Sequence, residues 1–414
     1  MARTGLTDVP PSTWTNWVGS QSFTPASTAA PRDEEEVAAL VRRAAEQGVG
    51  VRVAGAGHSF TPVVETSGLL LDLSALRGVV DADRDRKRVT VLAGTRIHDL
   101  YEPLWDAGLA LLNQGDIDTQ HIAGAVATAT HGSGTRYTSL SGVVRGVRLV
   151  TATGEVRDID GTEPDLLHAA QVAVGMLGVV TRLELEVTDA YRLRERVGLR
   201  SWDDVMEHWD ELVSQHRHFG FFWLPGEGSA ALYNLEGHGE RMADQCYVKV
   251  YDEVGPEIPD DDTEGRRVDR CYRIFPMVYD PNFHELEYFV PLERGPQALQ
   301  AMRELMRASL PDSVYPLEVR TVGADDAFLS PQYKTATTVI SVSGKPGTDY
   351  WRYLRSVDAL LADFGARVHW GKLHFLTPER LHALYPRADD FIALRRELDP
   401  EGVFLNDHLR PLFA

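Results

Sequence analysis

Apolar residues recur every three or four positions in several stretches of the chain, and this spacing predicts amphipathic helices. The clearest stretch covers residues 32–48, where acidic residues precede the apolar stripe, basic residues follow it and Gly48 closes it. The same criterion predicts further helices over residues 98–107, 165–173, 202–215, 297–309, 350–364 and 377–385.

Short runs of β-branched and apolar residues lie between these stretches and predict strands. They cover residues 51–53, 69–73, 88–92, 143–150, 156–159, 179–187, 220–224, 232–235, 247–251, 289–290, 317–320 and 338–342. A chain of 414 residues with this mixture of elements is expected to form an α+β fold of two or three domains. The composition shifts near Ala190, which indicates a domain boundary there.

One stretch, Val51-Arg-Val-Ala-Gly-Ala-Gly-His-Ser-Phe60, joins a predicted strand to a turn of small residues. Gly55 and Gly57 let the main chain turn tightly and approach a ligand closely. Main-chain N–H groups in such a turn form an anion-binding concavity, and His58 is presented at its end. A phosphate-bearing cofactor beside a reactive imidazole is the functional interpretation. A hydrogen-bonded structural histidine is the alternative.

Residues 111–134 are unusually rich in glycine, alanine, threonine and serine. Small residues allow the main chain to wrap an extended ligand, and amides and hydroxyls can donate hydrogen bonds to phosphate oxygens. We therefore predict that this segment is a cofactor cradle rather than an ordinary loop.

The overall charge narrows the set of partners. With 42 basic and 61 acidic residues the formal net charge is −19, which repels nucleic-acid phosphates and anionic lipid surfaces. We expect a small substrate that is not strongly anionic, with no nucleic-acid, membrane or metal partner. The first residues lack an apolar signal core, and no run approaches the roughly 18 apolar residues of a membrane span. A cytoplasmic monomer or small homo-oligomer is expected.

Three further features have simple explanations. Cys246 and Cys271 are predicted to be free thiols, with pairing as the alternative. The acidic run 256–264 is predicted to be a solvated loop, because carboxylates without a histidine or a fixed geometry make a poor metal site. The basic and aromatic residues of 367–374 are consistent with a surface patch or with part of a site.

Six motifs occur in the same order as in a known family. They are Gly55-Ala-Gly-His-Ser59, Thr130-His-Gly-Ser-Gly134, Tyr315-Pro-Leu-Glu-Val-Arg320, Leu329-Ser-Pro331, His369-Trp-Gly-Lys372 and Leu398-Asp-Pro-Glu-Gly-Val-Phe-Leu-Asn406. Through them the chain from about Trp14 to Phe413 resembles the sugar-1,4-lactone oxidases, such as gulonolactone and arabinonolactone oxidases, whose close neighbours are the alditol oxidases. These are flavoproteins of the vanillyl-alcohol-oxidase type. The resemblance implies a two-part FAD-binding domain over residues 1–190, an α+β substrate domain over 191–374 and a C-terminal segment, 375–414, that returns to the FAD domain.

The resemblance also implies roles for individual residues. It implies that His58 is bonded covalently to the C8 methyl group of the flavin and that Glu318, Arg320 and Lys372 are catalytic. It places four residues at the substrate, namely Asp116, Glu318, Arg320 and Ser341. The residues that it places at FAD, besides His58 and Lys372, are Ala54, Gly55, Ala56, Gly57, Ser59, Gly115, Asp116, Gly124, Ala127, Thr128, Thr130, His131, Gly132, Gly178, Val179 and Asn406.

These charges suit the removal of hydride from a carbinol carbon. Hydride transfer to flavin N5 leaves negative charge at N1–C2=O, where the resemblance places Lys372. Alternation along a strand points Glu318 and Arg320 to one face. Arg320 can then hold the developing alkoxide while Glu318 orients or accepts hydrogen bonds. A structural ion pair is the alternative for these two residues, and no dedicated base is evident.

Three positions bear on the choice of substrate and acceptor. Ser341 and Asp116 stand where alditol oxidases have histidine and serine, which weakens that assignment. Gly115 matches the oxidases, because related plant dehydrogenases carry an alanine that obstructs O2. A turn with positive φ is the alternative reason for this glycine.

We therefore expect an FAD-dependent oxidase that acts on a CH–OH group of an aldono-1,4-lactone or a related sugar or polyol. O2 is the expected acceptor and hydrogen peroxide the expected product. An alditol oxidase, a dehydrogenase with another acceptor and a flavin-binding protein without turnover are the alternatives.

Overall fold

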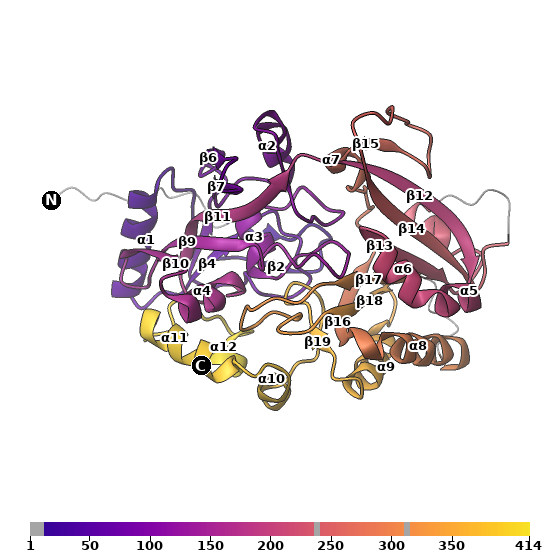
Figure 1. Cartoon of the computed structure of the whole chain (residues 1–414). Helices are drawn as coiled ribbons and strands as arrows, with labels where there is room; N and C mark the ends of the chain where they lie inside the picture. Colours follow the sequence, from indigo (N-terminus) through magenta and orange to yellow (C-terminus); the bar gives the residue numbers. More distant parts are fainter. Residues whose placement is uncertain (1–11, 236–240, 310–314) are drawn as a thin grey trace.

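The computed structural model describes residues 12–235, 241–309 and 315–414. Two bodies of strands and helices lie side by side, one built from the N-terminal half of the chain and the other from the middle (Figure 1). The strands of the two bodies follow each other directly, since β11 ends at Asp189 and β12 begins at Arg192.

The first body contains a small parallel sheet and a larger antiparallel sheet. The parallel sheet has the order β3 (Ser27–Ala29), β5 (Leu69–Asp72) and β4 (Val51–Ala54). The antiparallel sheet has the order β10 (Val156–Asp160), β9 (Val144–Val150), β11 (Val179–Asp189), β7 (Arg88–Leu92) and β6 (Val79–Asp83), with β8 (Leu109–Leu111) paired to β11. A short hairpin of β1 (Trp14–Thr15) and β2 (Ser22–Phe23) precedes them.

Helix α1 (Glu34–Glu46) confirms the clearest prediction from the pattern. The Asp33 side chain accepts a hydrogen bond from the Glu36 main-chain N–H, and three glutamates occupy the first turn, where the helix dipole favours negative charge. Gly48 follows the helix with φ of +64°, a conformation that glycine adopts without strain. The predicted helices near residues 98 and 165 are also present, as η1 (Ile97–Leu100) with α2 (Tyr101–Asp106) and as α4 (Pro164–Gln171).

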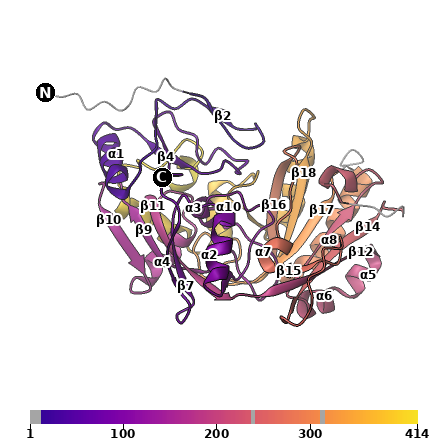
Figure 2. The ribbon, with the colours of Figure 1, turned by 90° about the horizontal axis from the view of Figure 1, so that it is seen from above.

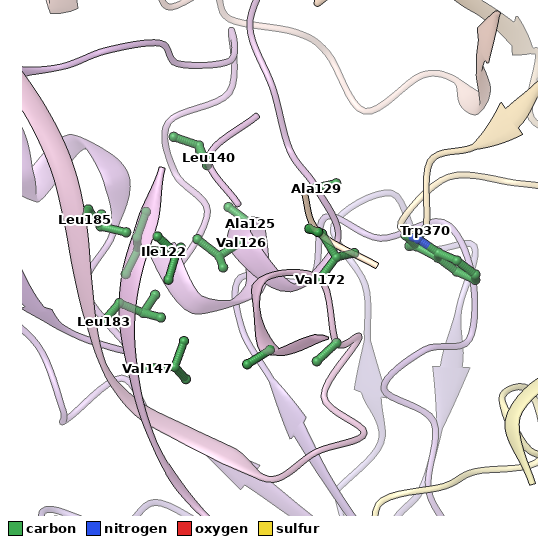
Figure 3. Packing of buried hydrophobic residues seen from close by; sticks show 14 of the residues in the cluster. Ile122, Ala125, Val126, Ala129, Leu140, Val147, Val172, Leu183, Leu185 and Trp370 are labelled. Carbon is green, nitrogen blue, oxygen red and sulfur yellow. The ribbon is translucent and has the colours of Figure 1, made fainter. Parts of the chain in front are cut away.

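The predicted cradle contains a helix of its own, α3 (Ile122–Ala127). Ile122, Ala125 and Val126 are buried on one side of it and pack with Val147 of β9 and Leu183 of β11 in one apolar cluster (Figure 3). This spacing of three and four residues is helical. The core therefore holds the cradle in place, and its small residues remain available to line a cavity.

The second body is an eight-stranded antiparallel sheet. Its order is β15 (Val268–Arg270), β12 (Arg192–Ser201), β14 (Gln245–Val254), β13 (His218–Leu224), β17 (Leu317–Val322), β18 (Thr337–Gly344), β16 (His284–Pro291) and β19 (Arg367–Val368). Helices α5 (Trp202–Glu207), α6 (Trp209–Gln215), α8 (Gly295–Ser309) and α9 (Trp351–Ala362) pack against its outer face. Figure 2 shows α5, α6 and α8 on the side away from the first body, so that the inner face is turned toward that body. Shorter helical turns are η2 (Ala230–Tyr233), α7 (Cys271–Ile274) and η3 (Leu292–Arg294).

One strand prediction is wrong, and several strands were not predicted, of which β12 is the longest. Residues 232–235 overlap the 3-10 helix η2 rather than a strand, because Ala230 and Tyr233 are buried three positions apart and Asn234 ends the turn in a left-handed conformation. Strand β12 was missed although Leu193, Val197 and Leu199 lie at alternate positions, because Glu195 interrupts this set and arginines occupy most positions between. Two of these, Arg192 and Arg196, form ion pairs with neighbouring aspartates.

The C-terminal segment returns to the first body as α10 (Pro378–Leu384), α11 (Ala388–Leu398) and α12 (Arg410–Phe413), drawn in yellow below α4 in Figure 1. Phe391 and Phe413 belong to the apolar cluster that contains the core of α4. The Asn406 side chain donates hydrogen bonds to the Pro62 and Glu65 carbonyls at 2.8 and 2.9 Å. The tail is thus an integral part of the first body.

The remaining predictions on ordinary features agree with the structure. Cys246 and Cys271 are free and buried, and the acidic run 256–264 lies in a loop. Within the described residues, the search for a helix long and apolar enough to cross a membrane finds none.

Candidate active site and cofactor cavity

Two cavities meet at His58. The first has an empty volume of about 1250 Å³ and lies among β4, α3 and the segment around Gly175, within the first body. The second, of about 810 Å³, lies between the two bodies and is lined by the inner face of the eight-stranded sheet. Both are lined by His58, Ser59, Gln120 and Thr128. The arrangement suits an elongated ligand in the first cavity whose reactive end reaches a second, smaller ligand.

The turn after β4 presents His58 because its glycines allow a close approach of the main chain. Gly57 has φ of +76°, and a Cβ atom there would lie 3.3 Å from the Trp14 side chain. The Asn16 side chain donates to the Ser59 carbonyl at 2.9 Å, and the Trp17 N–H donates to the Gly57 carbonyl at 2.9 Å. The N-terminal hairpin thereby fixes the turn.

His58 has one ring nitrogen in use and one without a partner. Its Nε2 lies 3.0 Å from the Thr119 hydroxyl, whereas its buried Nδ1 has no hydrogen-bond partner among the described residues. Burial, with a smaller contribution from the Lys372 charge, lowers the pKa of His58 to about 4. Buried polar atoms normally have hydrogen-bond partners. The unpaired nitrogen of this neutral imidazole, at the junction of the two cavities, therefore indicates that a partner is missing.

Most of the residues predicted to bind FAD or substrate line these cavities. Those at the first cavity are Ala54, Gly55, Ala56, Gly57, His58, Ser59, Gly124, Ala127, Thr128 and Gly178. Those at the second are Gly115, Asp116, Thr130, His131, Glu318, Arg320 and Lys372. Four predicted residues line neither cavity, namely Gly132, Val179, Ser341 and Asn406.

Two of these four residues contact segments that form the site without lining a cavity themselves. A Cβ atom on Gly132 would lie 2.2 Å from the Gln114 carbonyl oxygen, so this glycine lets the segments around residues 114 and 132 pack together. The Ser341 hydroxyl donates to Glu285 Oε1 at 2.5 Å, and Ser341 faces Glu318 across the β17–β18 pair.

Arg320 lies at the centre of a buried charge cluster. Its Nη2 donates to Asp116 Oδ2 at 2.6 Å and its Nε to Glu318 Oε1 at 2.6 Å. The Tyr279 hydroxyl donates to the same oxygen of Asp116 at 2.8 Å. Nη1 of Arg320 makes no hydrogen bond within the described part of the chain. Glu318 and Arg320 therefore point to one face of the sheet, as strand alternation predicts, and one end of the guanidinium is left for a ligand.

The pKa values of the two acids beside Arg320 are shifted in opposite directions. Burial raises the pKa of Glu318; Arg320 opposes this, but the nearby Asp116 charge adds to it. Burial also works to raise the pKa of Asp116, yet Arg320 and Lys249 bring it below the usual value. Two carboxylates of different proton affinity therefore flank one guanidinium, an arrangement typical of functional sites.

Lys372 is the second cation of the site and also has an acidic partner. Its ammonium forms an ion pair with Glu285 Oε2. Burial would lower the pKa of Lys372, but the Glu285 and Glu287 charges raise it. Because His369, Trp370 and Lys372 lie at or beside the second cavity and are largely buried, the alternative of a surface patch over 367–374 is wrong.

A histidine-rich cluster lies next to this pair. The donor atoms of His131, Glu287 and His369 all lie within 4.8 Å of one another. His131 donates from Nδ1 to the Gly132 carbonyl at 2.8 Å, and its Nε2 lies 2.9 Å from Glu287 Oε1. His369 Nδ1 accepts a hydrogen bond from the Gly371 N–H at 3.0 Å. The His131–Glu287 contact joins the two bodies at this point.

Several side chains of the site were not found from the sequence. Glu285 and Glu287 alternate with apolar residues in β16, and acids at that spacing in a strand are a signal of a polar inner face. Thr119 and Tyr279 lie outside helices and strands, where no periodic pattern marks them.

His218 joins the cradle to the eight-stranded sheet by a hydrogen bond. Because this histidine is buried, we expect folding stability to fall in acid. Its Nδ1 donates to the Ser133 carbonyl at 2.7 Å, and burial lowers its pKa to about 3. The unfolded chain, with a histidine pKa near 6.5, then binds more protons between pH 6.5 and 3. His218 therefore favours the folded state fully above pH 6.5, and this contribution falls by roughly 1.4 kcal/mol per pH unit on acidification.

We expect His218→Gln, which keeps a donor for Ser133, to flatten the fall of urea-unfolding free energy between pH 6.5 and 4. His98 is only partly buried, so His98→Gln serves as the control and should leave the slope unchanged. An equal slope in His218→Gln and the parent would remove His218 as a cause of acid sensitivity.

Comparisons with known proteins agree with this geometry. A sequence model described as D-arabinono-1,4-lactone oxidase matches residues 183–254 and 249–412, and an FAD binding domain matches residues 25–160. L-gulono-1,4-lactone dehydrogenase of Mycobacterium tuberculosis is 35% identical over 96% of this chain and 98% of its own length. Alditol oxidase of a Streptomyces species is 30% identical over 96% of this chain and 98% of its own length.

A solved structure shows the same fold at low sequence identity. Cholesterol oxidase from B. sterolicum superposes with a TM-score of 0.83 over 97% of this chain and 96% of its own, at 14% identity. The predicted fold, a vanillyl-alcohol-oxidase type FAD-binding domain with an α+β substrate domain, is thereby confirmed.

The first cavity fits the FAD that the matched domain implies. Glycine and alanine residues of the β4 turn and α3 leave room for a closely packed ligand, and the unpaired His58 Nδ1 points to a missing partner. No aspartate or glutamate is among the described residues that line this cavity. From the matches over most of its length, the chain belongs to the D-arabinono-1,4-lactone oxidase family and is an FAD-dependent oxidoreductase that acts on CH–OH groups.

Proposed function

We propose that this protein oxidises a CH–OH group of an aldono-1,4-lactone or a closely related sugar derivative, with O2 as acceptor and hydrogen peroxide as product. The observation that carries the proposal is the meeting of the two cavities at His58, with Arg320 and Lys372 on the walls of the second. We also propose that residues 1–190 and 375–414 form the FAD domain and residues 191–374 the substrate domain.

FAD, when bound, supplies the group that accepts hydride from the substrate carbon. Within the second cavity, Arg320 Nη1 can donate to the substrate hydroxyl oxygen while the hydroxyl proton passes to water. Asp116 and Glu318 hold the guanidinium in place through the hydrogen bonds described above. Lys372, which also lines this cavity, supplies a second positive charge and is held by Glu285. Such prearranged charges stabilise the transition state without moving during the reaction.

The charges in the second cavity favour an uncharged substrate. Four carboxylates line it, from Asp116, Glu285, Glu287 and Glu318, against the cations Arg320 and Lys372. Each cation is paired with at least one of these acids. A neutral lactone or polyol therefore avoids the repulsion that an aldonate anion would meet.

We propose further that His58 bonds covalently to FAD. Its unpaired Nδ1 is buried at the junction of the cavities, and burial keeps the imidazole neutral and therefore nucleophilic at pH 7. Thr119 fixes the ring through Nε2.

A substrate panel tests the proposed reaction. Lactones, alditols and aldonates should be offered to the purified protein under air, with detection of hydrogen peroxide, and in parallel without O2 with a dye as acceptor. We expect peroxide with at least one aldonolactone and weaker turnover of alditols. Turnover with the dye alone would assign a dehydrogenase, the activity in the name of the Mycobacterium tuberculosis relative. Flavin that no member of the panel reduces would contradict the proposal.

The acceptor preference yields a prediction for Gly115. This glycine lines the second cavity, and positive φ is not the reason for it, since it is absent from the glycines with that conformation. A Cβ atom there would lie 3.0 Å from the His131 carbonyl oxygen and 3.6 Å from Thr130 Cγ2. We expect Gly115→Ala to slow reoxidation by dissolved O2 in a stopped-flow experiment while reduction by substrate changes much less.

Because the added methyl group also crowds the His131 carbonyl, the reduction rate of the same variant is the internal control. If both half-reactions slow equally, the variant reports displacement of the cradle and Gly115 loses its role in O2 access. Slow reoxidation of the parent itself would favour the dehydrogenase.

A further inference from the structure

Arg52 is a buried cation beside the first cavity, three residues before Gly55, where the glycine turn begins. Its side chain is on β4, the residue is 5% exposed, and it lines the cavity. Its N–H groups donate only to main-chain carbonyls. Nε and Nη2 reach Val63 at 2.9 and 2.5 Å, Nη2 reaches Val174 at 2.8 Å, and Nη1 reaches Gly175 and Phe404 at 3.2 and 2.5 Å.

The N–H groups of Arg52 have hydrogen-bond acceptors, but its positive charge has no carboxylate partner among the described residues. A buried charge normally requires an opposite charge nearby. No carboxylate of the described residues lies within ion-pair distance of the Arg52 guanidinium. Burial lowers the pKa of Arg52 to about 10, so it remains a cation at neutral pH. Its field is felt nearby, since burial and the Arg52 charge together lower the pKa of His408 to about 4.

The cavity itself offers no protein group to balance this charge, because no acidic side chain is among its described lining residues. Three of the four residues whose carbonyls surround the guanidinium, Val63, Val174 and Gly175, also line the cavity. An anion in the cavity is therefore the available counter-charge. Oxidised FAD carries its negative charge on the diphosphate.

We propose that Arg52 is the electrostatic counter-charge for the diphosphate of FAD. It acts through its buried positive charge rather than by direct hydrogen bonds, because its donors are engaged by carbonyls. Within the described part of the chain, the main-chain N–H groups of Gly55, Ala56 and Gly57 donate no hydrogen bond, so they can bind phosphate oxygens directly. The inference requires that FAD binds, and it is independent of the covalent bond and of the substrate.

A pair of substitutions separates the charge from the hydrogen bonds. His58→Ala protein freed of cofactor is compared with the same protein carrying Arg52→Lys or Arg52→Met, and ADP and adenosine are titrated by calorimetry. Both substitutions break the guanidinium fork, but only Arg52→Met removes the charge. We expect Arg52→Lys to bind ADP within about threefold of the reference and Arg52→Met to bind it at least tenfold more weakly, about 1.4 kcal/mol.

Adenosine, which has no phosphate, should bind all three proteins alike. The difference for ADP should persist at high salt, because buried charges are screened little. Arg42→Met is the matched control, since Arg42 is exposed on α1 and does not line the cavity. Two results would overturn the proposal: equal ADP affinities for Arg52→Lys and Arg52→Met, or a loss of adenosine affinity in Arg52→Met as large as the loss of ADP affinity. Either would mean that Arg52 serves only to hold the surrounding main chain in place.

A measurement without substitution at Arg52 covers the case in which Arg52→Met does not fold. An anion beside Arg52 should cancel part of its field at His408, so saturating ADP should raise the pKa of His408 in an NMR titration, whereas adenosine should not. An unchanged His408 titration, or no preference of the protein for ADP over adenosine, would overturn the proposal.

Discussion

His58→Ala protein should give a colourless pellet on acid precipitation, with all of its flavin in the supernatant, whereas the parent pellet should stay yellow. Covalent attachment needs a neutral imidazole nitrogen that faces the cofactor. Nδ1 of His58 is the buried ring nitrogen without a partner at the junction of the two cavities. Mass spectrometry of the parent polypeptide should show the added mass of FAD, and the variant should lack it.

His121→Ala is the matched control, because His121 lines the same cavity and packs against Gly55. We expect it to retain covalent flavin. Thr119→Val, which removes the hydrogen bond to His58 Nε2, should slow attachment without abolishing it. Complete release of flavin from correctly matured parent protein would contradict the proposed covalent bond.

Lys372→Met should reduce its flavin about a hundred- to a thousandfold more slowly than the parent at saturating substrate, the usual effect of losing one charge-stabilising group. The substitution also leaves Glu285 buried without its cation. An unpaired buried charge typically costs about 3–5 kcal/mol of folding stability, so the single variant is expected to be less stable as well. Stopped-flow flavin absorbance and urea unfolding measure the two effects separately.

The double variant Lys372→Met with Glu285→Gln distinguishes the two roles. It should recover most of the lost stability, because neither member of the pair is left charged and buried. The rate should stay low if Lys372 stabilises charge on the cofactor. Recovery of the parent rate would instead mean that Lys372 serves only to neutralise Glu285.

Much of the fold and part of the site could be predicted because local rules dominate there. Helix α1 has its cap, dipole charges and apolar stripe within one short stretch, so no distant contact is needed to specify it. Strand alternation alone places Glu318 and Arg320 on one face. His58 is presented by a turn whose glycines are visible in the sequence.

The remaining parts depend on partners far away in the chain. β12 is a strand because β14 pairs along its whole length, which its charged sequence does not reveal. The acids that pair with the cations are equally remote, since Asp116 meets Arg320 across 204 positions and Glu285 meets Lys372 across 87. The sequence predicted catalytic roles for Arg320 and Lys372 but did not reveal Asp116 and Glu285 as their ion-pair partners.

The closure of the first body by the tail bears on the order of events in biosynthesis. The carbonyls of Val403 and Phe404 accept hydrogen bonds from Val51 and Arg52, beside the turn that carries His58. These partners are separated by some 350 positions, so a chain still on the ribosome has formed its glycine turn long before the last support of that turn exists. Domains tend to fold in order of synthesis, but this one must wait for a segment some 350 positions later. Loading of flavin is therefore expected only after Val403 and Phe404 have been synthesised, and a chain truncated before Val403 should yield an apoprotein rather than a shortened holoenzyme.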